Sequence, residues 1–323
     1  MIEIPEVLAN KARSLGAEAW LVDLAGAVAD IERDWGLSVG SPYADGTEGW
    51  VAPAIDRSGH RSVLKLCVPR PGDDPFALAR REITVLARAG GRGCVALERH
   101  DGDRGALLLE RLGPSLADIG QPFATRLEIL AGLAVSFWTP VSAQDPILAL
   151  GLQTGPQKAA WLIEFIETTW PELDRPCSEA AVADAIDAAR RRAAADNPQR
   201  AVLVHGDIHP WNTLRVDPTQ GAKGPASWRL IDPDGLVAEP EYDLGVLLRE
   251  DPEELLADIE AGDPRRRARW LAERTGTDEV AIWDWGLCER VSTGLLAAQI
   301  GLQPIGDQML AVADRLAEFD DRR

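Results

Sequence analysis

The amino-acid sequence predicts an α+β protein with two lobes, a small β-rich lobe over residues 1–112 and a larger, mainly helical lobe over residues 113–323. Three observations support this division. Short apolar runs broken by Gly, Pro, Asp and Ser fill most of the first part, which is typical of strands joined by turns. From residue 123 the apolar residues recur mainly at helical spacing. One β-rich interruption, residues 201–234, lies inside this helical part, and its loops are candidates for functional residues.

The first lobe is predicted to contain a helix and a five-stranded antiparallel sheet with one inserted helix. Residues 17–35 have the spacing of an amphipathic helix. Residues 37–69 predict three strands, and an acidic start followed by an early proline predicts a helix over about 74–89. Two further strands are expected over 94–101 and 104–113, as a hairpin around a glycine.

The composition excludes several classes of partner. The net charge is −18, and residues 113–323 carry 35 acidic and 20 basic side chains. Nucleic acid and anionic membrane surfaces are therefore unsuitable partners. No apolar run approaches the roughly 20 residues that cross a bilayer, and the N-terminus lacks an export signal, so we expect a soluble cytoplasmic protein. Most of the acidic excess is expected on a solvated surface, although part of it could attract a cationic ligand.

Lysine is rare enough for each position to matter. Only four of the 34 basic residues are lysines, and Lys65 lies inside the apolar strand "SVLKLCV". Glu82 on the following predicted helix shares a stripe with Leu78 and Leu86. A strand lysine held by a helix glutamate is the arrangement with which kinases bind nucleotide phosphates. Alternatively, Lys65 extends outward to solvent and Glu82 is solvated.

The segment "HGDIHPWN" carries the strongest chemical signal. Its histidines, His205 and His209, are four residues apart, but Gly206 and a following proline make a zinc-binding helix improbable. Asp207 and Asn212 instead give the spacing H-x-D-x-x-x-x-N of a kinase catalytic loop. Twenty residues further, "LIDPDG" ends an apolar run on a second carboxylate, Asp232. Oxygen ligands from an amide and a carboxylate suit Mg²⁺.

These motifs resemble the aminoglycoside phosphotransferase family of small-molecule kinases, whose catalytic loop reads H-G-D-x-H-x-x-N. "HGDIHPWNTLRV" together with "RLIDPDGLVAEPEYDLG" is most similar to the branch of the streptomycin 6-phosphotransferases and hydroxyurea-resistance kinases. The resemblance extends from about residue 20 to the end of the chain. It implies a bilobal protein-kinase-like fold, ATP or GTP with Mg²⁺ as cofactors, and phosphorylation of a hydroxyl on a small molecule.

The resemblance also implies roles for individual residues. Asp207 is expected to be the catalytic aspartate, with Asn212 and Asp232 as Mg²⁺ ligands. His205 is expected to brace the loop, and Asp243 to anchor it through main-chain hydrogen bonds. The nucleotide is expected to contact Lys65, Glu82, the main chain of Glu110 and Leu112, and the turn at Gly46 and Thr47. This turn departs from the family because it lacks G-x-G-x-x-G.

The substrate is less constrained by the sequence. The acidic second lobe favours a cationic, hydroxylated acceptor such as a streptomycin-type aminoglycoside, which would make the protein an antibiotic-resistance enzyme. Trp211, Trp285 and Glu289 are candidates to contact it, and the alternative for both tryptophans is packing. Two other functions stay open: a kinase of an amino sugar or another small metabolite, and a nucleotide-binding pseudokinase that serves as a binding module. The complete set of motif residues argues against the pseudokinase.

Overall fold

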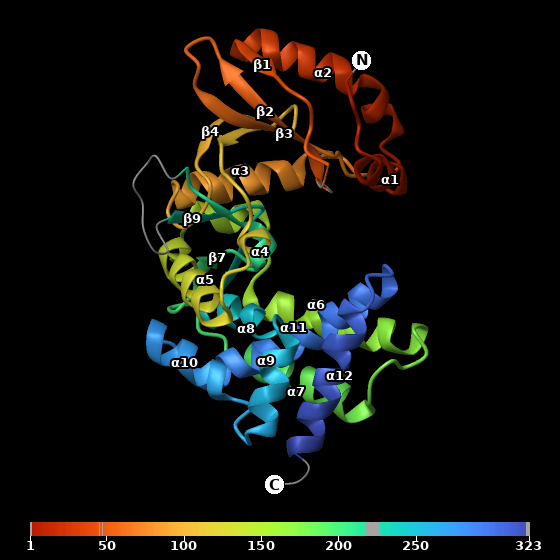
Figure 1. Cartoon of the computed structure of the whole chain (residues 1–323), viewed down its shortest axis with the longest axis vertical. Coiled ribbons are helices and arrows are strands. Elements are labelled where there is room, and N and C mark those ends of the chain that lie inside the picture. Colours follow the sequence, from red (N-terminus) through yellow and green to blue (C-terminus); the bar gives the residue numbers. More distant parts are fainter. Residues whose placement is uncertain (1, 45, 47, 218–226, 321–323) are drawn as a thin grey trace.

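The computed structural model describes residues 2–44, 46, 48–217 and 227–320. The predicted position of Thr47 lies outside this described part of the chain. The structure has a small upper lobe built on one sheet and a larger helical lobe below it (Figure 1). Within the described residues, no helix is both long and apolar enough to cross a membrane.

The upper lobe consists of a sheet with helices on both faces. Two helices come first along the chain, α1 (Glu6–Ser14) and α2 (Glu18–Trp35). A third helix, α3 (Ala77–Ala89), follows the third strand in sequence and precedes the fourth. The strands are β1 (Leu37–Val39), β2 (Gly49–Asp56), β3 (Arg61–Cys67), β4 (Leu97–Asp101) and β5 (Ala106–Glu110). They form one antiparallel sheet in the order β1-β2-β3-β5-β4.

Alternation along β3 decides where Lys65 points. Leu64 and Leu66 are buried in a cluster with apolar residues of α1 and α2, so the residues between them face the opposite side of the sheet. On that side lies α3, between the sheet and the lower lobe (Figure 1). Lys65 therefore points toward α3 and is only 5% exposed, because its strand is covered on both faces.

The lower lobe is mainly helical. Its helices are α4 (Leu116–Ile119), α5 (Phe123–Phe137), α6 (Gly155–Glu172), α7 (Glu179–Ala194), α8 (Glu241–Leu248), α9 (Pro252–Glu260), α10 (Arg266–Thr275), α11 (Glu279–Gln299) and α12 (Ile305–Asp320), with short 3-10 turns η1 (Pro146–Leu150) and η2 (Pro210–Asn212). Its short strands are β6 (Thr139–Pro140), β7 (Val202–Val204), β8 (Thr213–Arg215), β9 (Trp228–Leu230) and β10 (Leu236–Ala238). They form a three-stranded sheet, β10-β7-β6, and a β8-β9 hairpin.

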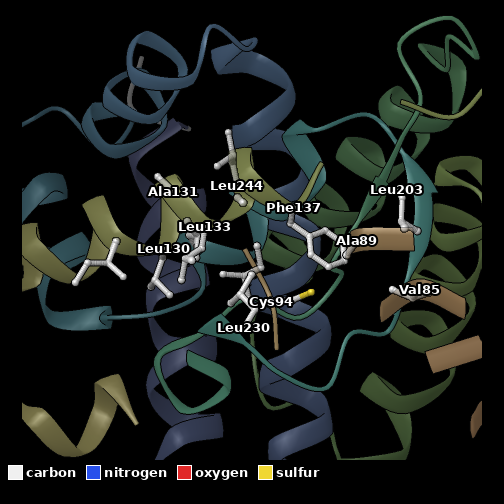
Figure 2. Close-up of a cluster of buried hydrophobic side chains, with 14 of the residues drawn as sticks. Val85, Ala89, Cys94, Leu130, Ala131, Leu133, Phe137, Leu203, Leu230 and Leu244 are labelled. Carbon is white, nitrogen blue, oxygen red and sulfur yellow. The ribbon is translucent and has the colours of Figure 1, made fainter. Parts of the chain in front are cut away.

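An apolar cluster joins α3 to the lower lobe. Val85 and Ala89 of α3 belong to the same buried cluster as Phe137 of α5 and Leu203 of β7 (Figure 2). Just after α3, the N–H of Val95 donates to the carbonyl of Leu230 at 2.8 Å. Because α3 is packed on the strands that lead to Asp207 and Asp232, its Glu82 is held at a fixed place relative to both carboxylates.

Candidate active site

The loop after β7 is held by Asp243 in the first turn of α8. The Asp243 carboxylate, which is fully buried, accepts hydrogen bonds from the main-chain N–H groups of His205 at 3.0 Å and Gly206 at 2.8 Å. It also accepts one from Nε1 of Trp138 at 2.9 Å. Gly206 has a φ of +95°, and a β-carbon there would lie 2.4 Å from Leu236 Cδ1. The loop therefore requires glycine at this position.

His205 supports this loop from inside the protein. Its Nε2 donates to the carbonyl oxygen of Ile231 at 3.0 Å, and its Nδ1 accepts from the N–H of Asp207 at 3.3 Å. The edge of the ring meets Phe137, with 5.4 Å between centroids. Burial lowers the pKa of His205 to about 4, so the ring is neutral at physiological pH. A neutral, fully bonded histidine positions the loop and is not available to take part in proton transfer.

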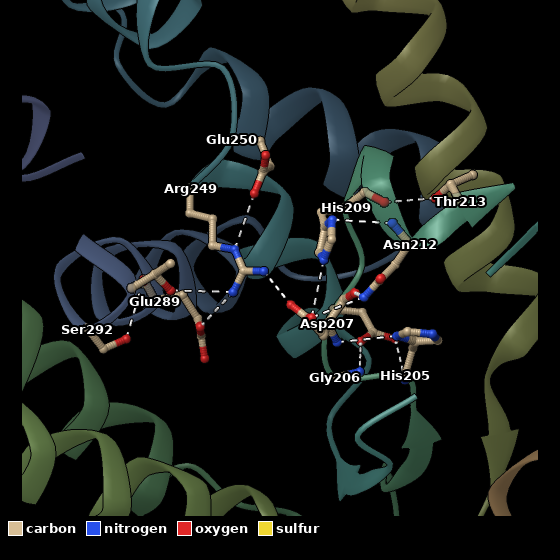
Figure 3. A network of polar contacts seen from close by, with 12 residues as sticks. His205, Gly206, Asp207, His209, Asn212, Thr213, Arg249, Glu250, Glu289 and Ser292 are labelled. Carbon is tan, nitrogen blue, oxygen red and sulfur yellow. Dashed lines mark hydrogen bonds and ion pairs between the residues drawn. The ribbon is translucent and has the colours of Figure 1, made fainter. Parts of the chain in front are cut away.

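Asp207 is surrounded by hydrogen-bond donors (Figure 3). His209 Nε2 lies 3.2 Å from its Oδ2, and Asn212 Nδ2 donates to the same oxygen at 3.1 Å. Arg249 donates to Oδ1. Burial by itself raises the pKa of Asp207, but the hydrogen bond from His209 and the charge of Arg249 outweigh burial and hold the pKa well below its usual range. The carboxylate is therefore ionised.

Lys65, Glu82 and Asp232 form a three-residue ion cluster. The Nζ of Lys65 lies 2.8 Å from both carboxylate oxygens of Glu82 and 2.8 Å from Oδ1 of Asp232. Burial opposes the charge of Lys65, but the two carboxylates raise its pKa well above the usual value. Asp232 adopts a φ of +54°, which is uncommon for a non-glycine residue and is found where surrounding contacts enforce it. The cluster joins β3, α3 and the strand end after β9.

One pocket, with a volume of about 690 Å³, connects these groups. Its lining includes the ion cluster, residues Asp207, His209 and Asn212 of the loop after β7, and a second group made of Gln153, Lys158, Trp161 and Asp234. A pocket of this size is typical of small-molecule sites. At the second group, Nζ of Lys158 lies 4.6 Å from the centroid of the Trp161 ring, and this ring also stacks on Phe165.

Asp234 differs from the other carboxylates of the pocket. Burial in the cleft and the neighbouring charge of Asp207 raise its pKa to about 6, while Lys158 acts in the opposite direction. The pocket therefore combines a carboxylate that stays ionised, Asp207, with one that titrates close to physiological pH. This difference follows from neighbours: Asp207 has Arg249 and His209 in direct contact.

Two of the three predicted substrate-contacting residues, Trp285 and Glu289, are buried away from the pocket. Trp285 is 1% exposed and lies in the core, where its ring packs on Tyr242 and its Nε1 donates to Glu239 at 2.8 Å. Glu289 is 3% exposed and binds Arg249 and the hydroxyl of Tyr242. Burial on α11 thus removes both from contact with a substrate. Trp211 is 64% exposed and is not among the pocket's lining residues. In this structure it therefore neither packs in the core nor forms a wall of this pocket.

The predicted nucleotide-binding residues Gly46, Glu110 and Leu112 lie in separate segments of the chain around the sheet of the upper lobe. Glu110 ends β5, and its N–H already donates to the carbonyl of Ala96 at 2.9 Å; Leu112 lies in the link to α4. Gly46 lies in the turn before β2, where a β-carbon would be 2.8 Å from the carbonyl oxygen of Gly49. None of these three lines the pocket described above. Their contacts with a nucleotide stay a prediction.

Sequence reasoning missed Arg249, Trp161 and Asp234. Arg249 could have been found, because it follows Tyr242 and Val246 at spacings of four and three, on the same buried stripe of α8. Trp161 and Asp234 have no comparable signal. They become candidates for substrate contact only in the folded chain, which brings α6 and the "DPDG" turn to one pocket.

A lobe that presents a buried lysine–glutamate pair above a catalytic loop and a strand-end aspartate defines a phosphotransferase with a protein-kinase-like fold. The macrolide 2'-phosphotransferase of Brachybacterium faecium superposes with a TM-score of 0.56 at 17% identity, over 90% of this chain and 98% of that one. The GDP complex of aminoglycoside 2'-phosphotransferase-IIIa gives a TM-score of 0.55 at 15% identity, over 92% and 99%. These similarities concern the fold.

The chain belongs to the aminoglycoside/hydroxyurea antibiotic resistance kinase family, whose model matches residues 35–301. It is 30% identical to a hydroxyurea phosphotransferase of Kitasatospora aureofaciens, over 98% of this chain and 86% of that protein. It is 29% identical to a streptomycin 6-kinase of Streptomyces griseus, over 98% of both chains. The protein is therefore a kinase that phosphorylates hydroxyl groups.

Proposed function

We propose that this protein transfers the terminal phosphoryl group of ATP or GTP to a hydroxyl of an aminoglycoside, with a streptomycin-type acceptor first, and that it thereby confers antibiotic resistance. The observation that carries this proposal is the pocket described above. Asp207 and the ion cluster around Lys65 line one part of it, and Trp161 and Asp234 line another. Relatives named streptomycin 6-kinase that align over most of the chain support the acceptor class.

The residues present fit a nucleotide with a divalent cation. Asn212 uses its Nδ2 to hold Asp207, which leaves its amide oxygen available as a ligand. Asp232 gives Oδ1 to Lys65 and its other oxygen stays available. Oxygen donors of this kind suit Mg²⁺, and Mg²⁺ bound there with the nucleotide would neutralise phosphate charge. Lys65, held in place by Glu82, supplies a further positive charge to the phosphates.

Asp207 is proposed to orient the acceptor and to receive its proton. The ionised carboxylate accepts a hydrogen bond from the acceptor hydroxyl and so directs the oxygen toward the terminal phosphoryl group. A carboxylate with so low a pKa is a weak base. It takes the proton late, when the bond to phosphorus is largely formed, as expected for a loose transition state. Positioning and charge, rather than strong basicity, therefore supply most of the rate enhancement.

A second acceptor class is favoured by the charges near α6. The acceptor end of the pocket carries Lys158 as well as Asp234, so it is not a purely acidic surface of the kind that suits a polycation. A small hydroxylated molecule with little net charge fits this mixture, and one relative is named hydroxyurea phosphotransferase. An amino sugar, with its one ammonium group, or another small metabolite also carries far less charge than a polycationic aminoglycoside.

The test is phosphate transfer from labelled ATP and GTP with Mg²⁺ to streptomycin, other aminoglycosides, hydroxyurea and amino sugars, with the product mass measured. We expect acceptor-dependent transfer to streptomycin and streptomycin resistance in a susceptible host that expresses the protein. Asp207→Asn should lower kcat by about a thousandfold or more while nucleotide binding by titration calorimetry is retained. Nucleotide binding without transfer to any acceptor would instead indicate a pseudokinase.

A further inference from the structure

Arg249 approaches Asp207 from the end of α8 (Figure 3). Its side chain is buried, and its guanidinium donates to Oδ1 of Asp207. The other carboxylate oxygen, Oδ2, is the one held by His209 and Asn212. The catalytic carboxylate is thus held on both oxygens, by two different parts of the lower lobe. None of the motifs in the sequence accounts for the contact with Arg249.

Arg249 is itself held by α11. Its Nη1 lies 3.3 Å from Oε2 of Glu289, and the other oxygen of Glu289 accepts from the hydroxyl of Tyr242 at 2.5 Å. Tyr242 in turn meets the edge of Trp285, with ring centroids 4.9 Å apart. A buried guanidinium is costly unless its charge is paired and its donors are satisfied. Glu289 provides that pairing, and Tyr242 fixes the orientation of Glu289.

The charges in this chain reinforce one another. Burial lowers the pKa of Arg249, but Asp207, Glu250 and Glu289 together raise it above the ordinary value. Burial raises the pKa of the Tyr242 hydroxyl, and the neighbouring Glu289 raises it further, so Tyr242 stays a neutral donor. The groups in contact with the Arg249 guanidinium are the carboxylates of Asp207, Glu250 and Glu289 and the Thr293 hydroxyl, 3.4 Å away.

We propose that Arg249 is a positioning residue for phosphoryl transfer, which fixes the Asp207 carboxylate in its reactive orientation, and that Glu289 and Tyr242 hold Arg249 for this purpose. The proposal rests on the proposed role of Asp207. Each carboxylate oxygen has two lone pairs, so Oδ1 can accept the acceptor hydroxyl beside Arg249. The hydroxyl proton passes to Asp207 as the new O–P bond forms and the bond to the nucleotide breaks; Arg249 keeps its protons throughout.

Three substitutions separate charge from position. Arg249→Gln removes both, and we expect kcat to fall by about tenfold or more while the acid limb of the pH profile moves up by about one pH unit or more. Arg249→Lys keeps the charge with poorer geometry, so both effects should be smaller. Glu289→Gln removes the support of Arg249 but leaves its charge, so kcat should fall several-fold without an upward shift of the acid limb.

The contact between Arg249 and Asp207 can also be tested by a measurement that needs no acceptor. The titration of Asp207 can be followed by carbon NMR of the protein labelled at aspartate carboxyls, with the signal assigned through Asp207→Asn. We expect the Asp207 signal to titrate at higher pH in Arg249→Gln than in the unchanged protein. This shift combined with no turnover of streptomycin or any other acceptor would contradict the proposed function and leave the role of Arg249 intact.

Arg191→Gln is the matched control. Arg191 also donates to a buried carboxylate, Asp284, which keeps a second partner in Arg192. Its loss should lower the melting temperature slightly, with kcat and the pH profile unchanged. The proposal is overturned if Arg249→Gln folds and keeps kcat within about twofold with an unmoved Asp207 titration. If Arg249→Gln does not fold, equal kcat for Glu289→Gln and the unchanged protein overturns it.

Discussion

At the scale of single residues, Asp234 shows how a neighbouring charge sets the state of a carboxyl group. In the folded protein its pKa is raised to about 6 from an ordinary value of 3.8, through burial first and the charge of Asp207 second. Asp207 and Asp234 lie in the same pocket, but among the residues that the structure describes, Asp207 forms an ion pair with an arginine and Asp234 does not. A carboxylate whose ionised form destabilises the fold is expected at positions where the residue serves binding and not stability.

Asp234→Asn is expected to stabilise the protein at neutral pH. Because the pKa of Asp234 is higher in the folded protein, the unfolded chain loses this proton at lower pH than the folded protein does. The carboxyl therefore lowers the free energy of unfolding increasingly from about pH 4 to about pH 6, and by a constant amount above that. Because the side chain is partly open to solvent, screening reduces the effect, and we expect a melting temperature higher by about 1–3 °C at pH 7.5. Scanning calorimetry from pH 5 to pH 8 measures it.

The control for this prediction is Asp103→Asn. The Asp103 side chain is 96% exposed and pairs with Arg80 at the surface, so its replacement should leave the melting temperature within about 1 °C. A gain for Asp234→Asn that is equal at pH 5 and pH 8 would show that its ionisation is not the cause. A simultaneous increase in the KM for a cationic acceptor would indicate that Asp234 faces the acceptor.

At the scale of elements, the loop between β7 and η2 depends on one helix turn of α8. Asp243 satisfies two consecutive main-chain N–H groups of the loop and one indole N–H. Short strands such as β7, with three residues, give little rigidity by themselves. The position of Asp207 is therefore fixed from outside its own strand, by α8 through Asp243 and through Arg249 at the opposite end of the same helix.

Asp243→Asn tests this dependence. The asparagine amide has one acceptor oxygen and places an NH₂ group against N–H donors, so at least one buried donor loses its partner. We expect a loss of about 2–4 kcal/mol in the free energy of unfolding, measured by urea denaturation, and a fall in kcat in the fraction that stays folded. Asp278→Asn is the matched control: Asp278 accepts from Ala281 N–H at the exposed start of α11, where asparagine caps equally well. Equal losses for the two variants would contradict the prediction.

At the scale of the whole molecule, the two lobes are joined at the "DPDG" turn. Gly235 has a φ of +68°, and a β-carbon there would lie 2.5 Å from Cγ2 of Val85 on α3. Its N–H donates to the carbonyl of His205 at 3.0 Å. This glycine therefore lies in close contact with both α3 of the upper lobe and the loop after β7 of the lower lobe. The close approach brings Glu82 and Asp232 to the same lysine.

Gly235→Ala is expected to separate the lobes at this point. The added methyl group overlaps a β-branched side chain that cannot rotate away easily, so α3 must shift and the contacts of Lys65 with Glu82 and Asp232 lengthen. We expect the nucleotide KM to rise by about tenfold and the melting temperature to fall. Gly262→Ala is the control, because Gly262 also has a positive φ, +77°, but a β-carbon there meets nothing within 4 Å. Nucleotide KM values that change equally in both variants would contradict a role for this close contact.

Several acidic side chains of the lower lobe lie inside it and do not face solvent. Buried carboxylates there bind arginines: Asp284 with Arg191 and Arg192, Glu241 with Arg200, Asp258 with Arg266 and Arg267, and Glu289 with Arg249. The excess charge visible in the sequence is thus no direct measure of the charge in the pocket, which contains both signs. This weakens the argument from net charge to a polycationic acceptor.

The sequence by itself determined the class of protein and pointed to the side chains that gather at the candidate site. Lys65 in an apolar strand, the five-residue spacing from Asp207 to Asn212, and the strand end at Asp232 are local patterns. Each follows from short-range geometry, because neighbours along a strand or loop are fixed by backbone periodicity. The bilobal kinase-like fold follows from the order of these patterns, and the fold comparisons confirm it.

Only the tertiary structure decided which side chains meet. Arg249 binds Asp207 across 42 positions of sequence, and Lys65 binds Asp232 across 167. The same packing made Glu289 a support for Arg249 and placed Trp285 in the core, where the sequence had left substrate contact open. Helical spacing shows which face a residue shares but not what that face meets, because the partner is chosen by how all the elements pack together.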